Sequence, residues 1–148
     1  MCNVLTTPAD QTPSPFPSFH DGYIVSITVV EKTATLGLRT SEGAAFELRL
    51  LGVEVFRADN FLEGNIVLEL EVEQGSTSKR TYVDARLDHL FPPPHPSAAS
   101  KYHAAHRDRL ATAAERISNG EAALVSLEPT YGCELVALCS EVHLVAQL

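Results

Sequence analysis

The ten residues PFPSFHDGYI, Pro15–Ile24, mark the point at which this sequence changes character. Before them the chain is polar and rich in proline, which fixes φ and pushes the preceding residue into extended geometry. After them the chain reads as one short strand after another, almost to its end. We therefore predict one domain over 1–148, in which 1–15 form a flexible proline-rich N-terminal arm and Phe16 and Phe19 pack against the body.

The composition is that of a globular protein with excess negative charge. Apolar residues make up 45% of the chain, charged residues 20%, and the net charge is −8. This charge argues against nucleic acid or an anionic membrane as a partner, because both need clustered Lys and Arg, but it permits a basic protein partner. No apolar run has the length of a membrane span and no signal-peptide pattern opens the chain. We expect a cytoplasmic protein, as a monomer or homodimer.

Alternation of apolar and polar residues predicts six strands before residue 90. The first covers Tyr23–Val30, with its odd-numbered residues on one face. The clearest covers Ile66–Val72, with its even-numbered residues toward the core and its glutamates toward water. The sixth is expected over Val83–Leu87, where apolar residues again alternate with charged ones.

The proline run Phe91–Pro96 ends these strands. Apolar residues three or four apart then predict one long helix near 97–118, capped by Ser97 or a neighbour and stopped by Asn119–Gly120. Further strands follow it, and Leu135–Leu138 is apolar on both faces. We predict a mainly β (α+β) fold: an antiparallel sandwich or curled sheet of about eight to nine strands, with the helix inserted before the C-terminal strands.

His20 and Asp21 are the side chains that most resemble a catalytic pair. Adjacent residues on an extended chain point to opposite faces, so we do not expect them to hydrogen-bond to each other. We interpret Phe19, His20, Asp21 and Gly22 as a structural signature: Asp21 and Gly22 turn the chain into the first strand, and His20 donates to the backbone. An interface or catalytic role for His20 remains open at this point.

Four later histidines, His89, His95, His103 and His106, are the candidate metal ligands. The last two are one helical turn apart, a spacing that can share a metal ion, but no Cys or Glu-x-x-His pattern supports such a site. We predict ordinary histidines, no metal and no cofactor. The three cysteines are expected to be buried reduced thiols. Nucleophile motifs are missing, so we expect no enzyme, although a triad assembled from distant positions leaves no local pattern.

Glu69, Glu71, Asp84 and Asp88 are the candidate binding residues. They combine into one acidic face if the fifth and sixth predicted strands pair. Opposed carboxylates on paired strands repel one another unless a cation such as Arg86 lies between them. The face is then either a solvated surface or a docking surface for a cationic partner.

Three stretches carry a family resemblance: PSFHD at Pro17–Asp21, LRLLGVE at Leu48–Glu54 and NFLEGNI at Asn60–Ile66. Together they resemble the immunity protein 50 family of bacterial polymorphic toxin systems, over about residues 15–73. The resemblance implies a non-enzymatic protein that binds and neutralises a cognate toxin in the producing cell, and it supplies no catalytic residue. The alternatives are a small-ligand or carbohydrate-binding β module and a His-dependent hydrolase.

Overall fold

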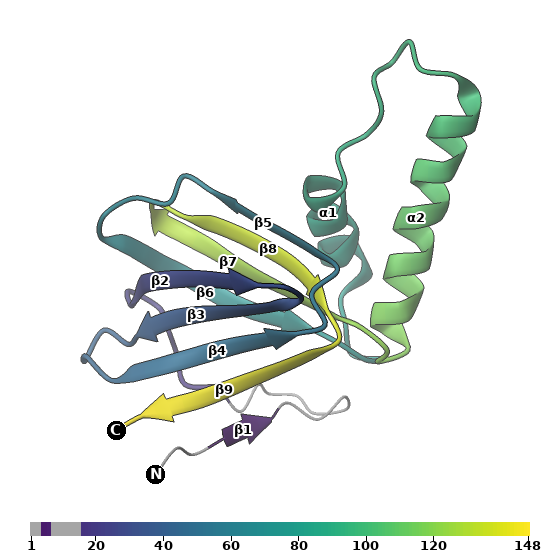
Figure 1. The fold of residues 1–148 in the computed structure, drawn as a ribbon. Coiled ribbons are helices and arrows are strands. Elements are labelled where there is room, and N and C mark those ends of the chain that lie inside the picture. Colours follow the sequence, from purple (N-terminus) through teal and green to yellow (C-terminus); the bar gives the residue numbers. More distant parts are fainter. Residues whose placement is uncertain (1–3, 7–15) are drawn as a thin grey trace.

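The computed structural model describes residues 4–6 and 16–148, which form nine strands and two helices (Figure 1). The strands are β1 (Val4–Thr6), β2 (Tyr23–Val30), β3 (Thr33–Arg39), β4 (Ala45–Leu51), β5 (Val55–Asp59), β6 (Asn65–Glu73), β7 (Ala123–Tyr131), β8 (Glu134–Cys139) and β9 (Glu141–Gln147). The helices are α1 (Arg80–Leu90) and α2 (Ser100–Ser118).

All nine described strands belong to one antiparallel sheet, in the order β1-β9-β4-β3-β2-β6-β7-β8-β5. A mainly β fold is confirmed. The strands share one hydrogen-bonded sheet and do not divide into two separate ones. The structure has two helices, α1 and α2, whereas the sequence predicts only the second. Of the predicted arm over 1–15, only Val4–Thr6 are described, paired with β9, and the rest lies outside the described residues.

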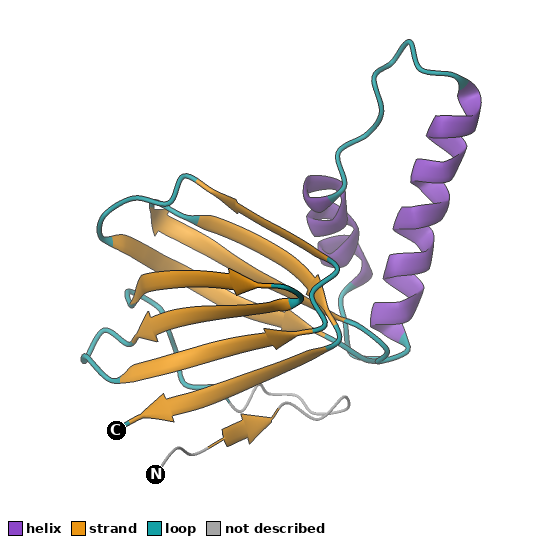
Figure 2. Cartoon of the chain, in the orientation of Figure 1, coloured by secondary structure: helices purple, strands orange, loops and turns teal. Residues whose placement is uncertain are grey.

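The sheet is folded on itself at the junction of β2 and β6. These strands pair only at Tyr23 and Ile24, whereas β2 pairs with β3 along its whole length, and a bulge interrupts β2 between Ile24 and Ser26. Bulges bend strands and increase their twist. Strands β2, β3, β4 and β9 therefore form one half-sheet, and β5, β6, β7 and β8 form the other (Figure 2).

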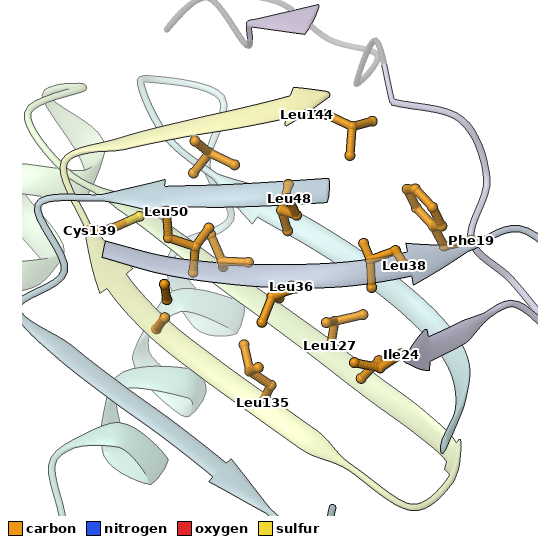
Figure 3. Packing of buried hydrophobic residues seen from close by; sticks show 14 of the residues in the cluster. Phe19, Ile24, Leu36, Leu38, Leu48, Leu50, Leu127, Leu135, Cys139 and Leu144 are labelled. Carbon is orange, nitrogen blue, oxygen red and sulfur yellow. The ribbon is translucent and has the colours of Figure 1, made fainter. Parts of the chain in front are cut away.

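The main core lies between the two half-sheets (Figure 3). Fully buried side chains of both halves meet there, and each such Leu contributes about 1.5–3 kcal/mol by leaving water. Phe19 packs edge-to-face on Phe46, with ring centroids 5.5 Å apart, and Phe16 packs against the same cluster. The predicted packing of both phenylalanines is confirmed. The buried leucines are Leu36, Leu38, Leu48, Leu50 and Leu144 from one half, and Leu127 and Leu135 from the other.

A second apolar cluster lies between the helices and the outer face of β7 and β8. Strands β7 and β8 are consequently buried on both faces. The apolar stretch Leu135–Leu138 predicts a central strand, and β8 lies between β7 and β5 in the sheet. The cluster contains Val83, Leu87 and Leu90 of α1, Ala113, Ala114 and Ile117 of α2, and Leu124, Val136 and Leu138 of the strands.

The predicted sixth strand over Val83–Leu87 is wrong, because this stretch belongs to α1. Its buried residues, Val83, Leu87 and Leu90, are four and three apart and share one helical face. In so short a window, positions 83, 85 and 87 also fit the period of a strand. The exposure of Ala85 separates the two patterns, because a strand would turn this residue inward with its neighbours.

Two strands also change phase where the sequence predicts regular alternation. In β2, Ile24 is buried and Val25 is exposed, because the bulge falls between Ile24 and Ser26. In β6, Val67 is buried and Leu68 is exposed, and the pairing with β7 shifts register on both sides of Val67. A bulge adds one residue to a strand and so exchanges its faces.

Helix α2 agrees with the predicted helix and ends at Asn119–Gly120 as expected. No side chain caps its first turn, so the cap predicted from Ser97 is not formed. The first half of α2 extends past the sheet (Figure 2), and Tyr102 in this half is exposed. Neither described helix is long and apolar enough to cross a membrane.

Candidate functional site: an acidic seam

A polar seam runs where α1 lies over the outer face of β5, β6, β7 and β8. Residues spaced four and three apart share one face of α1, and every second residue of a strand shares one face of the sheet. The seam is therefore assembled from five elements. We call it the acidic seam; it consists of Asp59, Glu69, Glu71, Glu128 and Glu134 from the strands and Tyr82, Arg86 and His89 from α1.

Arg86 compensates the negative charge in the middle of the seam. Its side chain is only 14% exposed and forms an ion pair with Glu128, and its Nη1 lies 3.6 Å from Oε1 of Glu134. The guanidinium also lies over the ring of Tyr82, 4.8 Å from the centroid. Arg86 thus ties α1 to two strands.

A second compensated group lies at the β5 end of the seam. Nε2 of His89 is 3.2 Å from Oδ2 of Asp59 and 3.9 Å from Oε1 of Glu134. Arg57 donates from Nε to Asp59 and from Nη1 to the backbone carbonyl of His89, both at 2.8 Å. Asp59 is therefore held between an arginine and a histidine.

Glu69 and Glu71, at the β6 end of the seam, are only partly compensated. The side chain of Glu71, through a hydrogen bond, and then burial and the negative charge of Glu71 raise the pKa of Glu69, and the more distant positive charges of Lys79 and Arg86 offset this only in part. Glu69 also lies directly opposite Glu128 in the β6–β7 register. Among the described residues, no Lys, Arg or His forms an ion pair with either Glu69 or Glu71.

Tyr82 borders this glutamate pair from α1. Its hydroxyl lies 3.0 Å from Oγ of Ser126, the residue opposite Glu71. Burial, and then a hydrogen bond to Glu71, raise the pKa of the phenol. Tyr82 therefore stays a neutral donor and does not compensate the charge of the pair.

An exposed aromatic patch adjoins the same end of the seam. Tyr23, Ile66 and Tyr131 lie directly opposite one another across β2, β6 and β7, and the tyrosines are 42% and 52% exposed. Phe61 and Leu62 are exposed in the loop that leads into β6. We call these five residues the aromatic patch. Ile66 is three residues from Glu69 on β6, which joins patch and seam.

The side chain of Asn65 fixes the loop of the aromatic patch in place. Its Oδ1 accepts hydrogen bonds from the backbone N–H of Leu62, at 2.8 Å, and of Cys133, at 3.0 Å. Asn65 itself is 1% exposed. The loop is thus clamped to the β7–β8 turn by a buried side chain, which limits the entropy that the patch loses on binding.

The structure brings together only two of the four predicted binding residues. Glu69 and Glu71 lie in the seam. Asp84 and Asp88 lie on the side of α1 that borders a groove toward α2, and Asp84 pairs with Arg80 at 2.8 Å. The single acidic face predicted from strand pairing is therefore not formed, because the sixth element is a helix.

Sequence reasoning missed most of the seam. Glu128, Glu134 and Asp59 reach it through long-range pairing of strands, which no local pattern announces. A signal was present for α1 in the spacing of Tyr82, Arg86 and His89, four and three apart.

His20 and Asp21 do contact each other, with Nδ1 of His20 3.2 Å from Oδ2 of Asp21. The expectation of an extended chain is wrong, because Asp21 has φ 61° and turns left-handed. The separation is that of an ion pair when His20 is protonated, and it does not contradict the prediction that the two side chains form no hydrogen bond. Both side chains are exposed. Phe19 and Gly22 are buried, and a Cβ on Gly22 would collide with the carbonyl oxygen of Arg39.

His95 and His106 each bond to a different partner within the chain. Nε2 of His106 is 2.8 Å from the backbone carbonyl of Phe91, and Nδ1 of His95 is 2.6 Å from Oγ of Ser97. Within residues 4–6 and 16–148 no three His, Cys, Asp or Glu side chains are grouped to hold a metal ion.

Both described cysteines are buried free thiols on or beside β8. Burial raises the pKa of Cys139 to about 12 and also raises the pKa of Cys133. A thiol must ionise to act as a nucleophile, so neither is activated.

No family model matches the chain, no curated protein is significantly similar to it, and no solved structure matches its fold significantly.

Proposed function

We propose that this chain is a non-enzymatic binding protein that docks a basic protein on the β6 end of the acidic seam and on the aromatic patch. The observation that carries the proposal is that Glu69 and Glu71 lie two residues apart on β6 and that neither forms an ion pair among the described residues. Two such carboxyl groups on one face of a strand are a ready acceptor for a Lys or Arg from another molecule.

The surroundings of the pair suit a protein interface. Tyrosine supplies much of the binding energy in such interfaces, because its large ring buries well while its hydroxyl finds a partner. Tyr23 and Tyr131 are exposed opposite Ile66, three residues before Glu69 on β6. A net charge of −8 adds long-range attraction for a basic protein and increases the rate of association.

The resemblance around Pro17–Asp21 makes the partner a toxin made by the same bacterial cell. On this proposal the chain neutralises the toxin by covering a basic surface that the toxin needs. Residues His20 and Asp21 have no chemical part in it.

Two charge reversals of equal size test the proposal. The variant Glu69→Lys/Glu71→Lys reverses the pair, and Asp84→Lys/Asp88→Lys makes the same change in net charge on the other side of α1. Each immobilised protein is exposed to lysate of the cell that makes it, and bound proteins are quantified by mass spectrometry. We expect a basic protein that the wild type and the Asp84/Asp88 variant retain equally.

The Glu69/Glu71 variant should lose this protein at least tenfold, since a buried charge contact is worth more than about 1.4 kcal/mol. Equal retention by all three proteins would refute the site. Co-expression of the chain with the captured protein, and recovery of growth, then tests whether that protein is a toxin.

A further inference from the structure

Strand β2 has one backbone edge without a partner. On its other side it pairs with β3 throughout, but toward β6 it pairs only at Tyr23 and Ile24. Beyond the bulge, no described strand pairs with that edge of Ser26–Val30. At about 3.3 Å per residue, the free edge is about 17 Å long.

Apart from the bulge that precedes it, the edge has none of the features that discourage strand pairing. Ser26–Val30 reads SITVV, with no charge, proline or glycine, and Val29 and Val30 are 50% and 63% exposed. By contrast, β5 at one end of the sheet carries Arg57 and Asp59 and lies against α1. Proteins normally guard exposed edges with charges or covering elements, so β2 is open to an added strand.

We propose that a second copy of this chain occupies the edge, its β2 running antiparallel around a twofold axis at Thr28. The absence of charge on Ser26–Val30 makes this edge the place where two copies can meet. The chain carries a net charge of −8, so two copies repel each other over most of their surfaces. The uncharged edge lets them meet without placing carboxylates opposite one another.

The side-chain pattern is also self-complementary in this register. Ile27 faces Val29 of the other copy, Ser26 faces Val30, and Thr28 faces itself. In the β2–β3 pairing, Ile27 and Val29 lie opposite core residues of β3, so both belong to the inner face of the sheet. Two apolar pairs and one Thr–Thr pair are favourable cross-strand neighbours.

The pairing joins two half-sheets into one continuous sheet across the axis. Five residues from each copy bury less than the roughly 1,200–2,000 Å² of a stable interface. The dimer should therefore dissociate on dilution. The Glu69/Glu71 pair takes no part in it, so this inference stands apart from the proposed function.

Sedimentation over a range of concentrations tests the proposal. The wild type should move from 16.0 kDa toward twice that mass as concentration rises. Thr28→Lys puts two lysines about 5 Å apart at the axis and should remain monomeric. Ser41→Lys, in the β3–β4 turn, makes the same charge change and should dimerise like the wild type. A monomeric wild type, or dimerisation of Thr28→Lys, would overturn the proposal.

A cross-link tests the register without disturbing the fold. Directly opposed strand residues have Cα atoms about 4.5–5.5 Å apart, within disulfide range. In a background with Cys2→Ser, Thr28→Cys should form a disulfide dimer under mild oxidation, while Ser41→Cys should not. The buried thiols of Cys133 and Cys139 are protected. A wild-type dimer that Thr28→Cys fails to cross-link would place the interface elsewhere and refute the inference.

Discussion

Glu69 and Glu71 are the carboxylates of the acidic seam that form no ion pair among the described residues. Elsewhere in the acidic seam each carboxylate has a cation beside it, Arg86 for Glu128 and Arg57 for Asp59. The glutamate pair has no ion-pair partner among the described residues, and the neighbouring Glu71 side chain together with burial raises the pKa of Glu69. Such an arrangement costs folding stability.

Glu69→Gln should therefore stabilise the protein at neutral pH. Because the folded-state pKa of Glu69 is raised, its ionised form is disfavoured by folding; this cost is present above the folded pKa and disappears as pH falls below the ordinary value of 4.5. The gain should be under about 1 kcal/mol, because solvent screens so exposed a group. Urea unfolding at pH 7 and pH 4 measures it.

The matched control is Glu47→Gln on β4. The Glu47 carboxylate already pairs with Arg49 at 2.7 Å, so its removal should give no stabilisation at either pH. If Glu69→Gln is no more stable than Glu47→Gln at pH 7, the glutamate pair is not under repulsion.

At the scale of elements, regular alternation predicts strands well wherever no bulge intervenes. In β3, Ala34, Leu36 and Leu38 all face the core as predicted. In β2 and β6 the strands are found, and Ile27, Leu70 and Val72 pack against the core as predicted. Only the start of each strand has the opposite phase, because no residue at Val25 or Val67 announces the bulge there. The short helix α1 is missed because its buried residues also fit a strand.

Two substitutions in α1 show whether this element is a helix in solution. Ala85→Glu should change the free energy of unfolding by no more than about 0.5 kcal/mol, because Ala85 faces water in the helix. Leu87→Ala should cost about 2–5 kcal/mol, because Leu87 is 1% exposed. Both are measured by chemical denaturation. A severe loss for Ala85→Glu would instead indicate the strand, which turns position 85 inward.

At the scale of the whole molecule, the fold class follows from the sequence but the arrangement does not. The number and type of short strands predict a mainly β domain. The pairing of β2 with β6, and of β9 with β4, joins segments distant in the chain, and local patterns carry no information about it. The same holds for the site. Glu69 and Glu71 could be named from one strand, whereas their neighbours depend on how α1 lies over the sheet.

The whole-molecule charge and the glutamate pair together predict how binding depends on salt. Attraction between a chain of net charge −8 and a basic protein raises the association rate, and dissolved salt screens it over about 10 Å at 0.1 M. A local contact at Glu69 and Glu71 adds to this effect only if the partner docks there. The comparison of equal charge reversals separates the local contact from the global field.

The most direct test is the association rate constant of the chain with its captured partner, measured by stopped flow at increasing ionic strength. For the wild type we expect a steep decrease with salt. Glu69→Lys/Glu71→Lys should associate more slowly at low salt and show a much flatter dependence, while Asp84→Lys/Asp88→Lys should stay closer to the wild type. Identical rates and salt dependences for the two double variants would contradict docking at the acidic seam.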